Sequence, residues 1–391
     1  MMEEVMESRE GKGERQLNLE LLRILSMLMI VLMHLINHGG VLEWVEDGSP
    51  SYYLVWTLFG ISFVAINCYV LISGYFLCES RFSFRRIAKT EGQVWFYSIL
   101  LYLAAVFLFG QEIDISTLVS AVFPVLSCEY WFVTMYIGML LLAPFVNRLL
   151  NGLSRGQFTV LLGICYLLFS VWPTVFFFSV GLNFGGGSGV VWFLVLYITG
   201  AYLRRFQGDL KKGSGHRWLI AACLLALIPA SRFAIEGILA SPLGKIGFLQ
   251  DLMWGYSIFY QYHSVLVLAA SIALFLAFSK LKIKRSGRTA WIGLVAPLTF
   301  GVYLLHDNPN LRGTLWGTLE PAGMCGKWYL IPGILGMALG LFAVCAAVEA
   351  LRRGIFKGIE TLLRRARKGK AGPIERLCAR LDERIFRKNG L

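Results

Sequence analysis

Residues 17–36 read LNLELLRILSMLMIVLMHLI, an apolar stretch long enough to cross a bilayer that nevertheless carries Arg23 and His34. At about 100° per residue, eleven steps return to within about 20° of the starting direction, so a helix presents both side chains on one side, about 16 Å apart along its axis. Ionisable groups in lipid normally face a bundle interior or a pathway. A structural role also fits, with Arg23 reaching the headgroups and His34 satisfied internally.

Apolar stretches of similar length recur along the chain. Of its 391 residues, 57% are hydrophobic and only 16% are charged, which is too apolar for a soluble protein of this size. We predict an all-α, polytopic integral membrane protein, a bundle of about ten transmembrane helices, with one membrane domain over residues 1–351. The expected spans are 17–36, 51–78, 92–110, 129–150, 157–178, 189–206, 217–232, 252–279, 289–306 and 328–351.

The distribution of basic residues predicts the orientation. With a cytoplasmic N-terminus, the inner segments hold all but five of the 37 Lys and Arg residues, the exceptions being Arg23, Arg232, Lys245, Arg312 and Lys327. This is the positive-inside pattern, and an even number of crossings places both termini in the cytoplasm. The net charge of +13 therefore reflects membrane topology, and we expect no nucleic-acid partner.

Residues 352–391 form a second, shorter region. They combine many basic residues with scattered apolar ones such as Leu363, Leu377 and Phe386. This composition predicts a basic amphipathic cytoplasmic tail lying on the anionic leaflet, broken in two near Pro373. A solvated tail that only sets the topology is an equal alternative.

Three further groups carry chemistry-bearing side chains. Arg85, Arg86 and Lys89 follow the second span and suit a ligand with phosphates, although topology charges give the same pattern. Glu129, Tyr130 and Trp131 begin the fourth span at its outer end, where aromatic residues also form interfacial belts. The eight cysteines show neither CxxC pairs nor metal-ligand spacing, so we predict no metal site.

The third group, His306 and Asp307 with Arg312 beyond, lies at the same side of the membrane as His34. A histidine with a nearby carboxylate is the minimal general-base arrangement. Adjacent helical positions diverge by about 100°, so Asp307 need not orient His306 and is free to serve another histidine, including His34. His38, one turn after His34, is a candidate for the same site.

Together these features resemble the bacterial transmembrane acyltransferase family 3, over most of residues 15–350. The sharpest match is Arg23-(ten residues)-His34, which is similar to that family's Arg/Lys-x10-His motif. Three further motifs support the resemblance: ISGYFL (72–77) with the Arg85-Arg86-x-x-Lys89 cluster, YWFVTMYIGMLLLAPFVN (130–147) and GVYLLHDNP (301–309). The last of them resembles the Gram-positive branch of the family. Lys89 stands where the family often has arginine. Lysine keeps the positive charge but cannot bind phosphate in the bidentate way that arginine does.

The resemblance implies a membrane-embedded O-acyltransferase of the bacterial cell membrane. It would move an acyl group, usually acetyl, from cytoplasmic acyl-CoA to a hydroxyl of an extracytoplasmic glycan or glycolipid, with no permanently bound cofactor. His34 would be the essential catalytic histidine, Arg23 its motif partner, and His306 part of the acceptor half. Arg85, Arg86 and Lys89 would lie near the CoA phosphates. We assign Glu129, Tyr130, Trp131 and Arg312 to acceptor binding and Asp307 to the catalytic group.

Two mechanisms and one competing function remain open. His34 either removes the acceptor proton in a ternary complex or carries the acyl group briefly itself. A transporter or flippase for a lipid-linked or anionic solute shares the intramembrane charges, but favours inverted repeats that the sequence does not show. The acceptor, the acyl group and the oligomeric state do not follow from the sequence.

Overall fold

The computed structural model describes residues 16–176, 185–206, 216–247 and 258–387, and these residues form helices and connecting turns without any strand. Eight of the described helical stretches are long and apolar enough to cross a membrane, and the shorter α15 is also apolar. The prediction of an all-α polytopic membrane protein is therefore confirmed. The main helices are α2 (Leu17–His38), α3 (Val41–Trp44), α4 (Pro50–Ser62), α5 (Val64–Leu77), α6 (Phe84–Phe109), α7 (Ile115–Val122), α8 (Trp131–Asn151), α9 (Arg155–Tyr166), α10 (Trp172–Val175), α11 (Val190–Arg205), α13 (Arg217–Ala240), α15 (Val265–Lys280), α16 (Ala290–Val295), α17 (Thr299–His306), α18 (Pro309–Leu319), α19 (Leu330–Ala366) and α20 (Pro373–Asp382).

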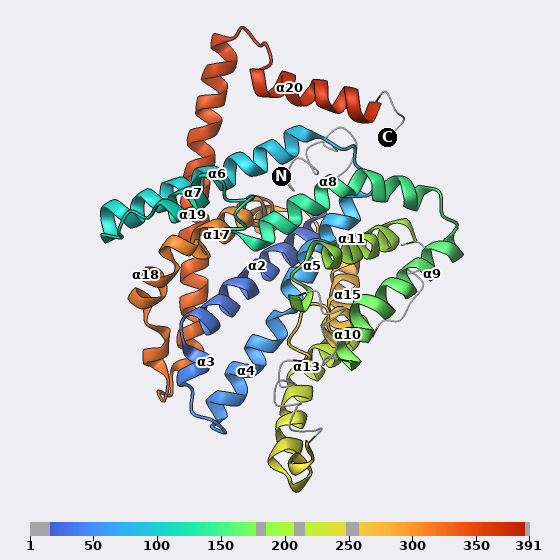
Figure 1. Ribbon diagram of the computed structural model, residues 1–391, viewed down its shortest axis with the longest axis vertical. Helices are drawn as coiled ribbons and strands as arrows, with labels where there is room; N and C mark the ends of the chain where they lie inside the picture. Colours follow the sequence, from blue (N-terminus) through green and yellow to red (C-terminus); the bar gives the residue numbers. More distant parts are fainter. Residues whose placement is uncertain (1–15, 177–184, 207–215, 248–257, 388–391) are drawn as a thin grey trace.

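Helix α5 lies at the centre of the bundle and is buried along its whole length. It packs against α2, α11 and α15 (Figure 1). The contact with α11 is close because Gly74 faces the Tyr197 backbone and Gly200 faces the Leu71 carbonyl, and neither position has room for a Cβ atom. Small residues that let helix backbones approach are the usual basis of tight packing in membranes.

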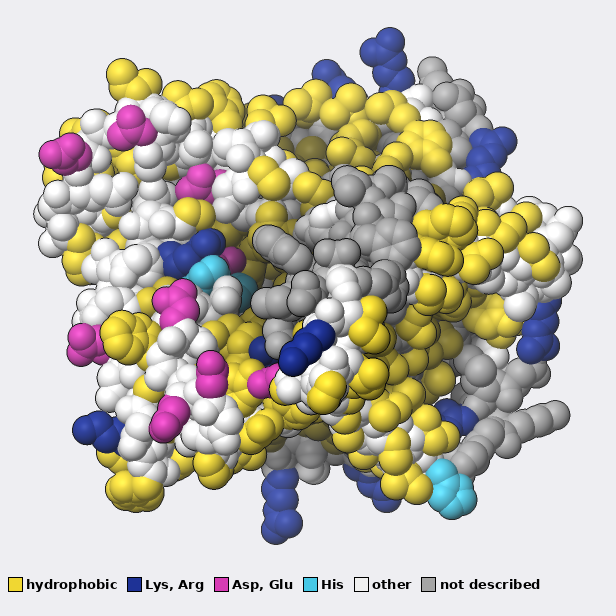
Figure 2. Space-filling model, turned by 60° about the horizontal axis from the view of Figure 1, so that its bottom comes forward, with side chains coloured by type: hydrophobic (Ala, Val, Ile, Leu, Met, Phe, Trp, Pro, Cys, Tyr) yellow, Lys and Arg dark blue, Asp and Glu magenta, His cyan; other side chains and the backbone are white. Residues whose placement is uncertain are grey.

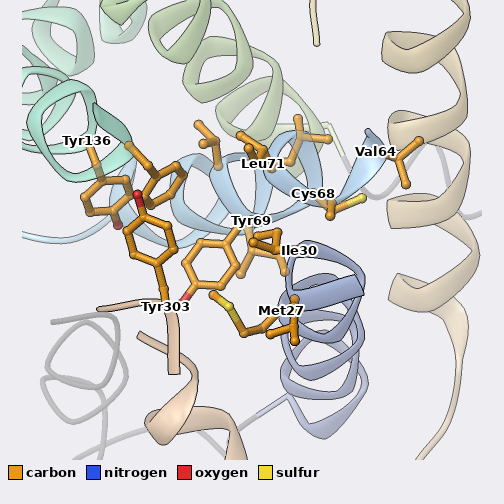
Figure 3. Close-up of a cluster of buried hydrophobic side chains, with 14 of the residues drawn as sticks. Met27, Ile30, Val64, Cys68, Tyr69, Leu71, Tyr136 and Tyr303 are labelled. Carbon is orange, nitrogen blue, oxygen red and sulfur yellow. The ribbon is translucent and has the colours of Figure 1, made fainter. Parts of the chain in front are cut away.

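The core around α5 is rich in aromatic rings. Figure 3 shows Tyr69 of α5, Tyr136 of α8 and Tyr303 of α17 converging on one buried cluster, with Met27 and Ile30 of α2 beside it. Phe132 stacks on Tyr136 at 5.8 Å between ring centroids and meets Tyr303 edge-on at 5.7 Å. These rings fill the middle of the bundle, at a level between Arg23 and His34.

Several boundaries differ from the predicted spans. Helix α6 begins at Phe84 and not near residue 92, so Arg85, Arg86 and Lys89 belong to its first two turns and not to a loop. Helix α13 continues to Ala240, and α19 runs unbroken from Leu330 to Ala366, across the expected domain boundary at 351/352. Apolar periodicity marks the lipid-crossing part of a helix, whereas the polar turns that extend it carry no such signal.

Two further differences concern the ends of helices. His263, expected within a helix, is buried two residues before α15 begins. Pro373 is the first residue of α20, a position that proline favours, so the break in the tail covers residues 367–372. Part of the predicted span 252–279 lies outside the described residues.

Candidate active site

His34 lies in a cluster of polar side chains at the end of the bundle that carries α3 and α18. We call His34, His38, His306, Asp307 and Arg312 the histidine cluster. His34 Nδ1 lies 3.0 Å from His306 Nε2 and 3.6 Å from Asp307 Oδ1. His34, His306 and Asp307 are all buried, whereas His38 is exposed. Figure 2 looks onto this end of the molecule and shows histidine side chains beside basic and acidic ones in a hollow of the surface.

The hydrogen bonds of the cluster define the tautomers of His306 and His34. His306 Nδ1 lies 2.6 Å from the Val302 carbonyl oxygen, which only accepts, so this nitrogen carries the proton. In a neutral ring, His306 Nε2 is then the acceptor and His34 Nδ1 donates to it. The second ring nitrogen of His34, Nε2, is left with its lone pair, which is the state that a base or nucleophile requires.

Asp307 is held by Arg312 and not by a histidine. Arg312 lies 3.1 Å from Asp307 Oδ1, and its guanidinium also donates to the Asp307 carbonyl. The separation of 3.6 Å from His34 is too long for a hydrogen bond. A carboxylate at that distance still stabilises a positive charge on His34, because a buried ion pair is weakly screened.

The cluster also has the spacing of a metal site. His34, His38 and Asp307 present ligand atoms within 4.8 Å of one another. Arg312 already supplies the positive charge beside Asp307, so a bound cation would be repelled by it. We therefore interpret the cluster as a group that handles protons.

The segment expected to bind the acceptor is tied to the histidine cluster by polar contacts. Tyr130 donates to the Leu304 carbonyl and accepts from Asn308, and Glu129 accepts from Asn310 at 3.0 Å. Trp131 stacks on Tyr262 at 5.8 Å. Glu129 and Tyr130 thus hold the start of α8 against the turn after His306.

Arg23 lies near the other end of α2, fully inside the bundle. Its guanidinium pairs with Glu20 at 2.8 Å, and both side chains are buried. The interpretation of Arg23 as an anchor to the headgroups is therefore wrong, since it is 2% exposed. Among the described residues, Arg23 Nε has no hydrogen-bond partner.

The three basic residues at the start of α6 take three different positions. Arg86 is buried, and its guanidinium donates to the Arg81 carbonyl at 3.4 Å. Arg85 instead pairs with Glu375 of the tail at 2.8 Å, and Lys89 is exposed.

Sequence reasoning missed two groups of residues that the structure brings forward. Glu20 was visible as an acid three residues before Arg23, a spacing at which helical side chains meet. Glu349, buried on α19, binds Arg352 at 2.7 Å and accepts from Tyr97 and Gln93 of α6. The sequence again offered a signal, an acidic residue three positions before Arg352. No sequence pattern indicated that Tyr97 and Gln93 of α6 would bind Glu349.

The fold and the site together define a polytopic membrane protein with a buried arginine and a buried histidine, Arg23 and His34, on one helix. The family model described as an acyltransferase domain, that of acyltransferase family 3, matches residues 16–350. The chain belongs to this family and is a membrane acyltransferase. No curated protein and no solved structure matches it.

Proposed function

We propose that this protein transfers an acyl group, acetyl in the simplest case, from cytoplasmic acyl-CoA to a hydroxyl of a glycan or glycolipid on the opposite side of the bacterial cell membrane. The observation that carries the proposal is the hydrogen-bonded pair of His34 and His306, which leaves His34 Nε2 available as a base. Two buried arginines lie in the other half of the bundle, where the donor would enter.

In the general-base route, His34 Nε2 takes the proton of the acceptor hydroxyl while its oxygen attacks the thioester carbonyl. The carbon–sulfur bond breaks, and the CoA thiolate takes the proton from His34. Asp307 stabilises the positive charge that His34 carries between these steps. In the covalent route, His34 Nε2 attacks the thioester carbonyl first, the carbon–sulfur bond breaks and CoA leaves as its thiolate. The acceptor hydroxyl then attacks the acyl-histidine, the carbon–nitrogen bond breaks, and the hydroxyl proton passes to the thiolate.

Arg23 and Arg86 suit the donor half of this reaction. Both are buried, and they come from two different helices, α2 and α6. Arginine binds phosphate oxygens in bidentate fashion, so both side chains suit a ligand with several phosphates. Arg23 is about 16 Å from His34 along α2, which places it on the donor and not on the acceptor.

The test is acetyl transfer or hydrolysis from radiolabelled acetyl-CoA in proteoliposomes, with the parent, His34→Ala and His216→Ala compared. His216 is exposed at the start of α13 and serves as the matched control. We expect turnover in the parent and in His216→Ala, and none in a stably folded His34→Ala. Failure of all three to turn over or to bind acetyl-CoA would contradict the proposal and favour a transporter or flippase.

A further inference from the structure

Helix α20 folds back onto the start of α6 (Figure 1). It follows α19 after a short turn and belongs to the tail, which lies outside the part of the chain that matches the acyltransferase family. Cys378 is its buried residue, whereas the apolar residues Ile374 and Leu377 are exposed. The helix therefore has a defined docking face, and this face meets α6.

Asp382 supplies the cap that α6 itself lacks. Ser83, at the N-cap position of α6, makes no capping hydrogen bond with its own side chain, and the first turn contains no acidic residue. Asp382 Oδ1 accepts from the Phe84 backbone N–H at 2.9 Å, and Oδ2 accepts from the Ser83 hydroxyl at 3.2 Å. The positive end of the α6 dipole is thus neutralised by a carboxylate from a residue almost 300 positions later.

Glu375 forms a second contact on the same face. It precedes Asp382 by seven residues, which is about two helical turns, so both side chains point to α6. Glu375 Oε1 pairs with Arg85 at 2.8 Å, and Arg364 lies 3.5 Å from the same oxygen. The Gly372 backbone N–H, with Arg85 and Arg364, holds the pKa of Glu375 below its usual range, so the carboxylate is charged at neutral pH.

The groups that contact these carboxylates are a backbone N–H, a hydroxyl and a guanidinium, which are groups of the kind that bind phosphate. A helix N-terminus with free backbone N–H groups, a hydroxyl and an arginine in its first turn is suited to an anion. Arg86, the neighbour of Arg85, is buried and donates to the Arg81 carbonyl. The α20 carboxylates thus lie next to the donor site that the proposed function assigns to this end of the molecule.

We propose that α20 is an autoinhibitory segment whose carboxylates, Glu375 and Asp382, compete with the phosphates of acyl-CoA for the groups at the start of α6. We call these contacts the tail latch. This inference rests on the proposed function, because it takes acyl-CoA as the donor. A latch that is closed for about nine-tenths of the time raises the apparent dissociation constant of the donor about tenfold.

The test compares two double variants of the full chain. Glu375→Gln with Asp382→Asn opens the latch, whereas Glu112→Gln with Glu383→Gln removes the same charge from acids outside the latch. Glu112 and Glu383 are both exposed. We expect the first pair to lower the dissociation constant and the KM of acetyl-CoA about tenfold with kcat unchanged, and the second to lower neither by more than twofold.

A second measurement separates the latch from the proposed function. Hydrogen exchange of residues 373–382 should accelerate when CoA saturates the parent, because displaced α20 loses its contacts with α6. CoA binding without faster exchange, or equal affinities in both double variants, would overturn the latch and leave the proposed function intact. Absence of CoA binding in the parent and in both double variants would overturn the proposed function instead. Binding confined to the variant with Glu375→Gln and Asp382→Asn would support both.

Discussion

A hydrogen bond between two histidines fixes which nitrogen of His34 is available for chemistry. In the familiar arrangement a carboxylate orients the catalytic histidine, but here Asp307 is engaged by Arg312 and His306 takes that place. His306 is itself oriented by the Val302 carbonyl of its own helix. We therefore regard His306 as a positioning residue, since it orients His34 by a hydrogen bond and acts on the proposed reaction only through that residue.

Replacing His306 by alanine should lower kcat by about 10²–10⁴-fold, the usual contribution of a correctly protonated base. The KM for acetyl-CoA should change little, because His306 is remote from the donor half. The substitution His306→Gln offers an amide oxygen to the His34 Nδ1–H, so it should recover part of the loss. A steady-state comparison of the two variants checks this, and equal kcat in His306→Ala and the parent would refute the relay.

The Glu20–Arg23 pair allows structural and functional roles to be separated. Arg23→Gln leaves a buried carboxylate without its partner and should destabilise the protein by about 3–5 kcal/mol. Adding Glu20→Gln should restore most of the thermal stability of the purified protein, measured as its unfolding temperature in detergent. Activity should stay low in both variants if Arg23 holds the donor. Recovery of activity together with stability would assign Arg23 a purely structural role.

At the level of single elements, α17 depends on one glycine. Gly301 lies against the buried Glu349 side chain, and a Cβ atom there would overlap with it. Glu349 in turn joins α19 to Tyr97 and Gln93 of α6. The helix that carries His306 is thus positioned by a polar cluster at the opposite end from the histidine cluster.

Gly301→Ala should therefore cost about 1–3 kcal/mol of stability, as overpacking in a core does, and should reduce activity by shifting His306. Gly336→Ala on α19 is the matched control, because in the described part of the chain no atom beyond its own helix backbone lies within 4 Å of a Cβ added there, and it should leave both quantities unchanged. Unfolding temperature and initial rate report the two effects. Equal behaviour of the two variants would show that α17 tolerates the displacement.

The sequence predicts individual helices better than the polar contacts that join one helix to another. Apolar length located the long apolar helices, but not the short helices α3, α7 and α18 between them. Arg23 and His34 both lie on α2, as expected, and both are buried. The pairing of Arg85 with Glu375 and of Ser83 with Asp382 joins residues almost 300 positions apart, and no local pattern reports such a contact. The start of α6 at Phe84 was missed for the same reason, since its cap comes from the tail.

For the whole molecule, the two ends of the bundle carry different chemistry. Arg23, Arg86 and the tail latch lie at one end, and the histidine cluster lies at the other. Figure 1 shows α20 at the end opposite α3, and Figure 3 shows the aromatic rings of the core between the ends. The distribution of Lys and Arg predicts that the first end faces the cytoplasm. Under the proposed function, acyl transfer would run from a soluble donor inside to an acceptor outside.

The most direct test of the central claim uses inverted membrane vesicles, whose cytoplasmic face is outside. Acetyl-CoA labelled in its acetyl group is added to the outside, and label that resists an added esterase is then counted inside the vesicles. We expect protected label with the parent protein and none with His34→Ala at equal protein level. Label that stays outside, or that enters equally with both proteins, would contradict acyl transfer across the membrane through His34.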